Sequence, residues 1–357
     1  MPESGQKRPV TRLRRVDCSG PGIRRRRRGK GFEYFDEDGR RVTEPSVIER
    51  IRGLAIPPAW EGVWVCPYPF GHIQATGVDA AGRKQYRYHD LWRERRDREK
   101  FESMEDFARA LPRLRRRVQR DLAREGMSRE RILACAARLL DRGFFRIGSE
   151  DYAEENDTYG IATMQKRHAT VSGDEVTFDY EAKGGQRRVQ VIGDPVIADV
   201  VRALKRRRGG GEELLACKDG RRWVDVKSDD INQYVKDATG GDFSSKDFRT
   251  WSGTVLAAVA LAVSGMAAAS KTSRKRAKTR AVKEVARYLG NTPAVCRASY
   301  IDPRVFDRFD GGITIGGVLP ELIEDIGPWP NVQGAVEEAV LDLIEDDRSS
   351  AALEIAA

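Results

Sequence analysis

The chain has 357 residues, of which 33% are charged and 40% hydrophobic, and its formal net charge is +9. This composition excludes a membrane-embedded chain and favours a globular protein of two or three domains with a polyanionic partner, most simply nucleic acid. The five cysteines have no CxxC spacing, which argues against a disulfide scaffold and against a zinc site.

The charge is unevenly distributed along the chain. Residues 1–30 hold eleven Lys/Arg and two acids, and residues 271–280 hold six basic residues in ten. Beyond Gly317 there are ten acids and one arginine. Each run alone is compatible with a solvated, mobile face, but two basic runs and an acidic tail together favour an electropositive DNA-binding surface.

Neither a signal peptide nor a membrane-spanning segment is expected. The first ten residues, MPESGQKRPV, have no apolar core. The longest apolar run, residues 255–269, is shorter than the roughly 20 residues that a spanning helix needs. We expect this run to form a buried helix, and the protein to lie in the reducing cytoplasm with no membrane partner.

The first part of the chain predicts a small β-rich domain. Residues 1–21 are expected to form a disordered basic arm, followed by a β-rich domain over residues 22–95. The segment GFEYFDEDGRRV has aromatic alternation and an Asp-Gly turn, and the residues that follow are rich in Trp, Tyr, Val and Gly. Residues 89–101, HDLWRERRDREKF, are predicted to be a charged connection.

Residues 99–357 predict a mostly helical domain with one inserted hairpin. Ser128 is a candidate N-cap, and Gly143 a stop, for a helix with apolar residues at helical spacing. Alternation on both sides of KGGQ predicts a β-hairpin with Lys183 at or beside its tip. Asp194-Pro195 then opens a helix. Further helices are expected at about 228–238, 246–264, 273–289 and 293–300, with an acidic amphipathic pair over about 318–347. The fold class is therefore α+β.

Tyr300, in the segment CRASYIDP, is a candidate nucleophile whose chemistry needs partners. A tyrosine hydroxyl has a pKa near 10 and needs nearby positive charge to attack phosphorus at neutral pH. Arginine suits the phosphoryl oxygens because it stays charged and presents a planar fork. A leaving alkoxide needs a proton from a positioned acid.

Suitable partners lie upstream of Tyr300. Arg146 stands among apolar residues in GFFRIGSEDY, and Lys183 stands on the hairpin. Lys246 and Arg249 are three residues apart at a helix start, where anions are favoured. Asn291 follows a Gly cap nine residues before Tyr300. Each alone is compatible with an ordinary surface ion pair or a solubilising charge, so the ordered set is what points to a site.

The ordered set of candidate catalytic residues and the sequence motifs around them resemble those of the type IB DNA topoisomerases, most closely the short poxvirus-like form found in bacteria. The resemblance covers roughly residues 22–310. It rests on IPPAWEGVWVCPYPFGHIQATGVDAAGRKQYRYH in the first domain and on FFRIGSE, YGIATMQKRH, KDFRTW and YLGNTPAVCRASYIDP in the second. It implies a β-rich N-terminal domain followed by a tyrosine recombinase/type IB topoisomerase-like catalytic domain.

The resemblance also implies a role for each residue. Tyr300 would attack the scissile phosphate, giving a 3′-phosphotyrosine and a free 5′-hydroxyl. Arg146 and Arg249 would hold the non-bridging oxygens, Lys183 would protonate the leaving oxygen, and Asn291 would donate a hydrogen bond. Viral and eukaryotic relatives have His where Asn291 stands, and an amide cannot titrate near neutrality, so a proton-shuttle role for Asn291 is doubtful.

The resemblance implies an enzyme that relaxes supercoiled DNA by cleavage, strand swivelling and religation, without ATP, metal or other cofactor. A monomer clamped around double-stranded DNA and associated with the nucleoid is expected. Gln85, Tyr86 and Tyr88 match family residues that contact DNA. Further candidate DNA contacts are Lys84, His168 and Lys246. The strand KQYRY is otherwise an exposed polar strand, and a structural role for His168 is equally open.

Two alternative functions are retained. A tyrosine recombinase or integrase shares the catalytic architecture, although that family usually has HxxR where this chain has Lys246-Asp-Phe-Arg249, and usually has a helical DNA-binding domain. A non-catalytic DNA-binding protein with a decayed site is the other alternative, against which the complete Arg/Lys/Arg/Asn/Tyr set argues.

Overall fold

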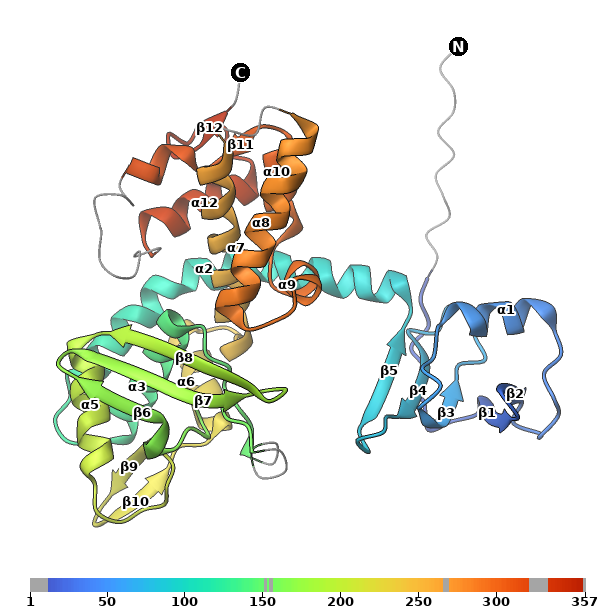
Figure 1. Cartoon of the computed structure of the whole chain (residues 1–357), viewed down its shortest axis with the longest axis horizontal. Helices are drawn as coiled ribbons and strands as arrows, with labels where there is room; N and C mark the ends of the chain where they lie inside the picture. Colours follow the sequence, from blue (N-terminus) through green and yellow to red (C-terminus); the bar gives the residue numbers. More distant parts are fainter. Residues whose placement is uncertain (1–11, 151–152, 154–156, 266–269, 321–332, 356–357) are drawn as a thin grey trace. The chain divides into compact units, whose positions relative to one another are not determined.

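The computed structural model describes residues 12–150, 153, 157–265, 270–320 and 333–355. The chain divides into two compact units, Met1–Lys100 and Phe101–Ala357. No helix among the described residues is long and apolar enough to cross a membrane. The architecture is an antiparallel β-rich unit followed by a mostly helical one (Figure 1), as the sequence predicted.

The first unit is built on a five-stranded antiparallel sheet with strand order β2-β1-β3-β4-β5. Its core contains Ile23, Ile51, Val63, Val65 and Ala75, so the helix α1, which carries Ile51, packs on this sheet. The elements are β1 (Ile23–Arg28), β2 (Gly31–Phe35), α1 (Pro45–Gly53), β3 (Glu61–Val65), β4 (Ile73–Val78) and β5 (Lys84–Tyr88).

The run of five arginines, residues 24–28, forms most of strand β1. These residues pair with β2 in the register Arg24↔Phe35 to Arg28↔Gly31. The guanidiniums of Arg25 and Arg26 lie 4.1 and 4.6 Å from the ring centres of Phe32 and Phe35. Two phenylalanines of β2 thus form cation–π contacts with the strongly basic strand β1.

Part of the expected disordered arm is ordered. Residues 1–11 lie outside the described residues, but the backbone of Arg14 bonds on both sides, to the Phe70 carbonyl and from the His72 amide, at 2.9 Å each. The Val16 amide donates to His72 Nδ1 at 3.1 Å, and Trp64 Nε1 donates to the Gly20 carbonyl at 3.2 Å. Backbone pairing, which composition does not reveal, therefore fixes residues 12–21.

The predicted charged connection is helical, which was not expected: residues 90–101 belong to the long helix α2 (Asp90–Leu122), within which the boundary between the two units falls. Its first turns carry no apolar stripe, and its buried residues begin at Phe101. Arg and Glu are nevertheless good helix formers, and the Arg95–Glu99 pair at (i, i+4) spacing has an N···O distance of 2.8 Å. Propensity and ion pairs thus form this helical stretch without hydrophobic periodicity.

The second unit packs helices around α3 and places a three-stranded sheet, order β6-β7-β8, beside them (green in Figure 1). The helix α5 contacts β6 and β7 of this sheet. The elements are α3 (Arg129–Gly143), η1 (Lys166–His168), β6 (Ala169–Ser172), β7 (Glu175–Ala182), β8 (Gln186–Gly193), α5 (Pro195–Arg206), β9 (Ala216–Asp219), β10 (Arg222–Asp225), α6 (Ser228–Thr239), α7 (Ser245–Gly265), α8 (Lys271–Leu289), α9 (Pro293–Ser299), α10 (Pro303–Asp310), β11 (Ile313–Thr314), η2 (Gly316–Val318), α12 (Ala335–Glu345) and β12 (Glu354–Ile355).

Most of the predicted helix boundaries are confirmed. Ser128 caps α3 by accepting a hydrogen bond from the Arg131 amide, and Asp194 caps α5 with Pro195 in its first turn. The helix α7 is the buried helix expected from the apolar run, of which residues 266–269 lie outside the described residues. The hairpin β9–β10 was not predicted, because its strands have only four residues each and give no clear alternation.

The acidic C-terminal segment is described only in part. Residues 321–332, which cover much of the first predicted helix of the pair, lie outside the described residues. The second, α12, buries Val336, Ala339, Val340, Leu343 and Ile344. It contacts α7 and α10, so this acidic helix packs as part of the helical unit.

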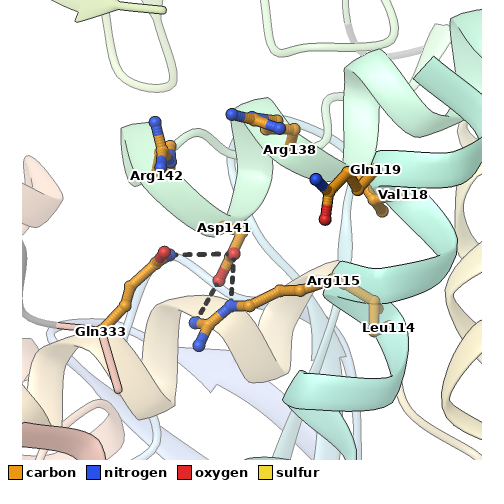
Figure 2. A pocket seen from close by; sticks show the side chains of 8 residues that line it. All are labelled: Leu114, Arg115, Val118, Gln119, Arg138, Asp141, Arg142 and Gln333. Carbon is orange, nitrogen blue, oxygen red and sulfur yellow. Dashed lines mark hydrogen bonds and ion pairs between the residues drawn. The ribbon is translucent and has the colours of Figure 1, made fainter. Parts of the chain in front are cut away.

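One ion-pair network connects α12 to the helices of the core. Arg115 on α2 lies between two carboxylates, with bonds to Asp141 on α3 at 2.9 Å (Figure 2) and to Glu337 on α12 at 2.5 Å. Gln333 also donates to Asp141, at 2.9 Å. Glu337 in turn accepts a hydrogen bond from Trp251 Nε1 on α7 at 2.9 Å. The network therefore ties four helices together, including the helix that carries Arg249.

Replacing Arg115 with alanine is expected to lower the free energy of unfolding by about 3–5 kcal/mol, because two largely buried carboxylates lose their counter-charge. The Asp141 and Glu337 side chains are only 9% and 12% exposed. The matched control is Arg109→Ala, which breaks an exposed pair with Glu345 between the same two helices, α2 and α12. It should cost less than about 1 kcal/mol. Equal losses in urea unfolding would contradict this account.

Candidate active site

Four helix ends in the second unit bring together four of the five predicted catalytic residues. Arg146 follows the end of α3, and Arg249 lies in the first turns of α7. Asn291 follows Gly290, the C-cap of α8, and Tyr300 is the C-cap residue of α9. All four residues therefore lie at or near helix ends, where the chain turns and side chains from different helices can converge.

Arg249 is the most enclosed member of the group, with only 4% of its surface exposed. Its Nη1 donates to the Phe144 carbonyl at 2.6 Å, and its Nη2 donates to the Leu289 carbonyl at 2.9 Å. Nη2 also donates to Asn291 Oδ1 at 2.7 Å. The Arg249 Nε, by contrast, is buried and has no hydrogen-bond partner among the described residues.

Asn291 bridges the two predicted arginines. Its Oδ1 accepts from Arg146 Nη2 at 2.8 Å as well as from Arg249. Arg146 Nη2 also donates to the Gly290 carbonyl, at 2.9 Å. Because the side-chain oxygen is occupied by both guanidiniums, the amide NH₂ of Asn291 is the part of this side chain suited to donate to a ligand.

Tyr300 lies against Arg249. The guanidinium carbon is 5.1 Å from the centre of the tyrosine ring, and the two side chains also form a hydrogen bond. The backbone of the segment is held by α7: the Asp302 amide donates to Thr254 Oγ1 at 3.1 Å. A Cβ at Gly253 would lie 2.5 Å from the Tyr300 carbonyl oxygen, so this close approach requires glycine. Tyr300 is thus held beside Arg249 in the free protein.

Pro303 follows the segment that carries Tyr300. It stands in the first turn of α10, with Asp302 as the N-cap that accepts from the Arg304 amide. Arg304 also forms ion pairs with Asp302 and with Glu105 on α2. The proline therefore begins a new helix that anchors the residues directly after Tyr300.

The turn after α3 is strained where it meets Arg249. Gly143 is the last residue of the helix, but the left-handed residue is Phe144, with φ +55°. This conformation costs a side-chain-bearing residue about 1–2 kcal/mol. The Phe144 carbonyl accepts the bond from Arg249 Nη1, so the strained turn aims a carbonyl at the buried guanidinium.

The charge balance of the site is positive. Burial, and next the charge of Arg146, lower the pKa of Arg249 to about 10, so it remains protonated at neutral pH. Tyr300 acts in the opposite direction, and Arg188 adds a further lowering effect. Among the described residues, the Arg249 guanidinium bonds to carbonyl and amide oxygens and forms no ion pair with a carboxylate. A buried guanidinium that forms no ion pair with a carboxylate is suited to bind an anion.

Arg188 on β8 is a charged neighbour that the sequence reasoning missed. Burial lowers the pKa of Arg188, Tyr180 raises it, and Arg146 lowers it further. A usable signal was present: the turn at residues 183–185 pairs Ala182 with Gln186 and therefore Tyr180 with Arg188. The alternation Val176, Phe178, Tyr180 faces the core, so its partner Arg188 shares that face.

Lys183, the fifth predicted catalytic residue, lies in the exposed turn between β7 and β8. Direct contacts join the other four residues to one another, and the turn of the β7–β8 hairpin places Lys183. Gly184 and Gly185 follow it with φ angles of +83° and +67°. Its role as the proton donor stays a prediction.

The predicted DNA contacts of the first unit divide between the two faces of strand β5. Tyr86 and Tyr88 are exposed and stacked, with ring centres 5.9 Å apart, and Lys84 Nζ lies 5.6 Å from the Tyr86 ring. Gln85 points to the opposite face, because side chains alternate along a strand. Its Nε2 donates to Asp79 Oδ2 at 2.9 Å. Lys84, Tyr86 and Tyr88 therefore form one surface from which Gln85 is absent.

His168 and Lys246 have different surroundings. His168 is buried at the end of η1, where its Nδ1 accepts from the Gln165 amide at 3.1 Å and its ring lies 4.4 Å from that of Tyr159. Burial lowers the pKa of His168, which keeps it neutral at pH 7. These contacts favour the structural role that the sequence left open. Lys246 is exposed on α7, while Arg249, three residues later, is buried.

This geometry places a tyrosine side chain beside a buried arginine, within a positively charged cluster. Comparison with known proteins places the chain among the DNA topoisomerases. Residues 89–310 match the model of the eukaryotic DNA topoisomerase I catalytic core, and residues 31–79 match that of the bacterial DNA topoisomerase IB N-terminal domain. The chain belongs to the type IB DNA topoisomerase family and is an enzyme of that class, as its motifs predicted.

The chain is similar to viral members of the family. It is 32% identical over 289 residues to the DNA topoisomerase 1B of Acanthamoeba polyphaga mimivirus, covering 78% of this chain and 85% of the relative. It is 23% identical over 108 residues to the Vaccinia virus (strain Copenhagen) DNA topoisomerase 1B, covering 30% of this chain and 34% of that protein. Both matched family models are those of topoisomerases: one covers residues 89–310, which carry the candidate active site, and the other covers residues 31–79 of the first unit.

Proposed function

We propose that this enzyme relaxes supercoiled DNA by cutting one strand through a 3′-phosphotyrosyl intermediate, allowing the strand to swivel, and religating it. The observation that carries the proposal is the buried guanidinium of Arg249, which has an unpartnered Nε, no neutralising carboxylate among the described residues, and the Tyr300 ring 5.1 Å away. A phosphodiester is the anion that a planar guanidinium suits best.

In the cleavage step, the Tyr300 oxygen forms a bond to phosphorus as its proton passes to water, and the bond from phosphorus to the 5′ oxygen breaks. Arg146 and Arg249 hold the non-bridging oxygens, on which charge increases in the transition state. Asn291 donates through its amide NH₂, and Lys183 gives the leaving 5′ oxygen its proton. Religation is the reverse attack by the 5′-hydroxyl on the phosphotyrosine.

This chemistry needs no external energy source. The phosphotyrosine diester conserves the energy of the broken bond, so the exchange runs in either direction without ATP. The guanidiniums and the lysine supply the positive charge, and we propose that neither a metal nor another cofactor takes part. Neither conclusion depends on the sign of the supercoils, so positive and negative supercoils are both expected to be removed.

The first unit is proposed to hold the duplex during this reaction. The surface of Lys84, Tyr86 and Tyr88 offers a cation and two stacked phenols, which suit a DNA backbone. Lys246 is proposed as a further backbone contact in the second unit. We infer a monomer that clamps around double-stranded DNA and works in the cytoplasm with the nucleoid, since that is where its substrate lies.

The test is relaxation of a supercoiled plasmid by the purified protein in EDTA and without ATP. A ladder of partly and fully relaxed topoisomers is the expected result, with both positively and negatively supercoiled plasmids. Binding of the plasmid without any relaxation would instead support a DNA-binding protein with an inactive site. Relaxation that stops on chelation would refute the metal-free mechanism.

A further inference from the structure

Arg188 occupies a position between two parts of the site that are far apart in the sequence. It lies on β8, five residues after Lys183, in cross-strand register with Tyr180. Its guanidinium crosses to the end of α8, where Nη1 donates to the Arg287 carbonyl at 3.0 Å and Nη2 donates to the Tyr288 carbonyl at 2.5 Å. One side chain thus links the hairpin to the residues just before Asn291.

The two carbonyls that Arg188 binds belong to the last turn of α8, whose carbonyls lack the usual partner four residues further on; the Arg287 carbonyl also accepts from the Gly290 amide, at 3.3 Å. A cation at a helix C-terminus is also favoured by the helix dipole. The next residue, Gly290, leaves the helix with φ +59°. A Cβ at Gly290 would lie 2.8 Å from Arg188 Nη1, so the guanidinium packs directly on the turn that leads into Asn291.

The neighbouring arginine on the same strand is different. Arg187 is exposed and forms an ion pair with Asp179 across the hairpin, at 2.6 Å. Arg188 is instead half-buried, and its contacts are backbone carbonyls. It also adds a repulsive charge near Arg146 and Arg249. Holding a third, half-buried guanidinium near those of Arg146 and Arg249 is unfavourable for stability alone, which points to a role in the site.

We propose that Arg188 is a positioning residue that fixes the hairpin carrying Lys183 against the turn carrying Asn291. The proposal rests on the proposed function. The Arg188 side chain has two effects: it keeps the amide of Asn291 between Arg146 and Arg249, and it fixes the place of the hairpin turn that carries Lys183. The phosphate-binding groups and the acid for the leaving oxygen are thereby held at fixed positions relative to one another. This matters because a misplacement of about 1 Å can lower the rate about 10²-fold.

The test measures single-turnover cleavage of a DNA duplex whose short 5′ fragment dissociates after the cut, so that religation does not occur. Arg188→Ala is expected to slow cleavage by about 10- to 100-fold, with DNA affinity and melting temperature close to those of wild type. The matched control is Arg187→Ala, which removes the same charge from the same strand and should cleave at the wild-type rate. Equal rates for the two variants would overturn the proposal.

A double-variant cycle shows whether Arg188 acts through Asn291. Adding Arg188→Ala to Asn291→Ala should slow cleavage by less than it does in the wild-type background, because the group being positioned is already gone. If the double variant lost the full product of the two single fold-losses in cleavage rate, Arg188 would not act through Asn291. Arg188→Lys keeps the charge but cannot span both carbonyls, so an intermediate loss is expected and a wild-type rate would count against the proposal.

Failure of this inference differs from failure of the proposed function. If Arg188→Ala and Arg187→Ala both cleave like wild type, the enzyme is active and only the role of Arg188 is refuted. If wild type itself forms no covalent adduct on this substrate, the proposed function fails first. Should Arg188→Ala melt at a lower temperature, Arg188→Lys supplies the comparison of rates.

Discussion

Replacing Tyr300 with phenylalanine is expected to abolish DNA relaxation while leaving the fold and DNA binding intact. The substitution removes only the hydroxyl and keeps the ring that lies 5.1 Å from the Arg249 guanidinium. Without the nucleophile no covalent intermediate forms, and the cleavage rate should fall by roughly 10⁶-fold. Time courses with supercoiled plasmid, over a wide range of enzyme concentration, measure the loss.

Tyr288→Phe is the matched control for this prediction. Tyr288 lies at the end of α8 and is 39% exposed, with its ring 5.8 Å from that of Phe144. Loss of that hydroxyl should change the relaxation rate by less than about threefold, because phenylalanine keeps the ring beside Phe144 and the backbone carbonyl that Arg188 binds. Full relaxation by Tyr300→Phe would identify another nucleophile and remove the basis of the mechanism.

Replacing Arg249 with alanine is expected to slow cleavage by about 10³- to 10⁵-fold, the range seen when an arginine that stabilises a phosphoryl transition state is lost. DNA affinity should change little, because the contact strengthens mainly as charge develops on the phosphate. Single-turnover cleavage gives the rate, and equilibrium binding to the same duplex gives the affinity. Loss of affinity with an unchanged rate would make Arg249 an ordinary DNA contact.

Two further variants separate charge from geometry in this prediction. Arg249→Lys keeps a cation but cannot bond the Phe144 and Leu289 carbonyls and Asn291 together, so it should recover only part of the rate. Arg202→Ala removes one positive charge from α5, where Arg202 pairs with Asp199, and should leave the rate unchanged. A comparable loss in Arg202→Ala would attribute the effect to net charge.

The sequence predicted those parts of the fold that have a local physical signal. Ser128 and Asp194 are capping residues, and the structure uses both as caps. The alternation around Lys183 predicted the β7–β8 hairpin, and the apolar run predicted α7. The convergence of Arg146, Arg249, Asn291 and Tyr300 was expected only through the family resemblance, since no periodicity brings together residues that far apart.

The remaining features depend on interactions that a linear pattern does not display. The start of α2 lacks an apolar stripe, and residues 12–21 are held by backbone bonds such as those of Arg14. The left-handed turn falls on Phe144 and not on Gly143, because tertiary contacts of its carbonyl with Arg249 maintain it. In the sequence, Arg187 and Arg188 form a basic pair of the kind usually exposed. Only the register of the hairpin, which pairs Arg188 with Tyr180, places Arg188 on the buried face.

The central claim is that Tyr300 becomes covalently joined to the 3′ end of cleaved DNA. The most direct measurement is to trap the adduct on a duplex whose 5′ fragment dissociates, digest the protein and identify the modified peptide by mass spectrometry. The account predicts one DNA-bearing peptide, with the 3′ phosphate on Tyr300, formed in EDTA and absent in Tyr300→Phe. An adduct at another residue, or at the 5′ end of the DNA, would contradict it.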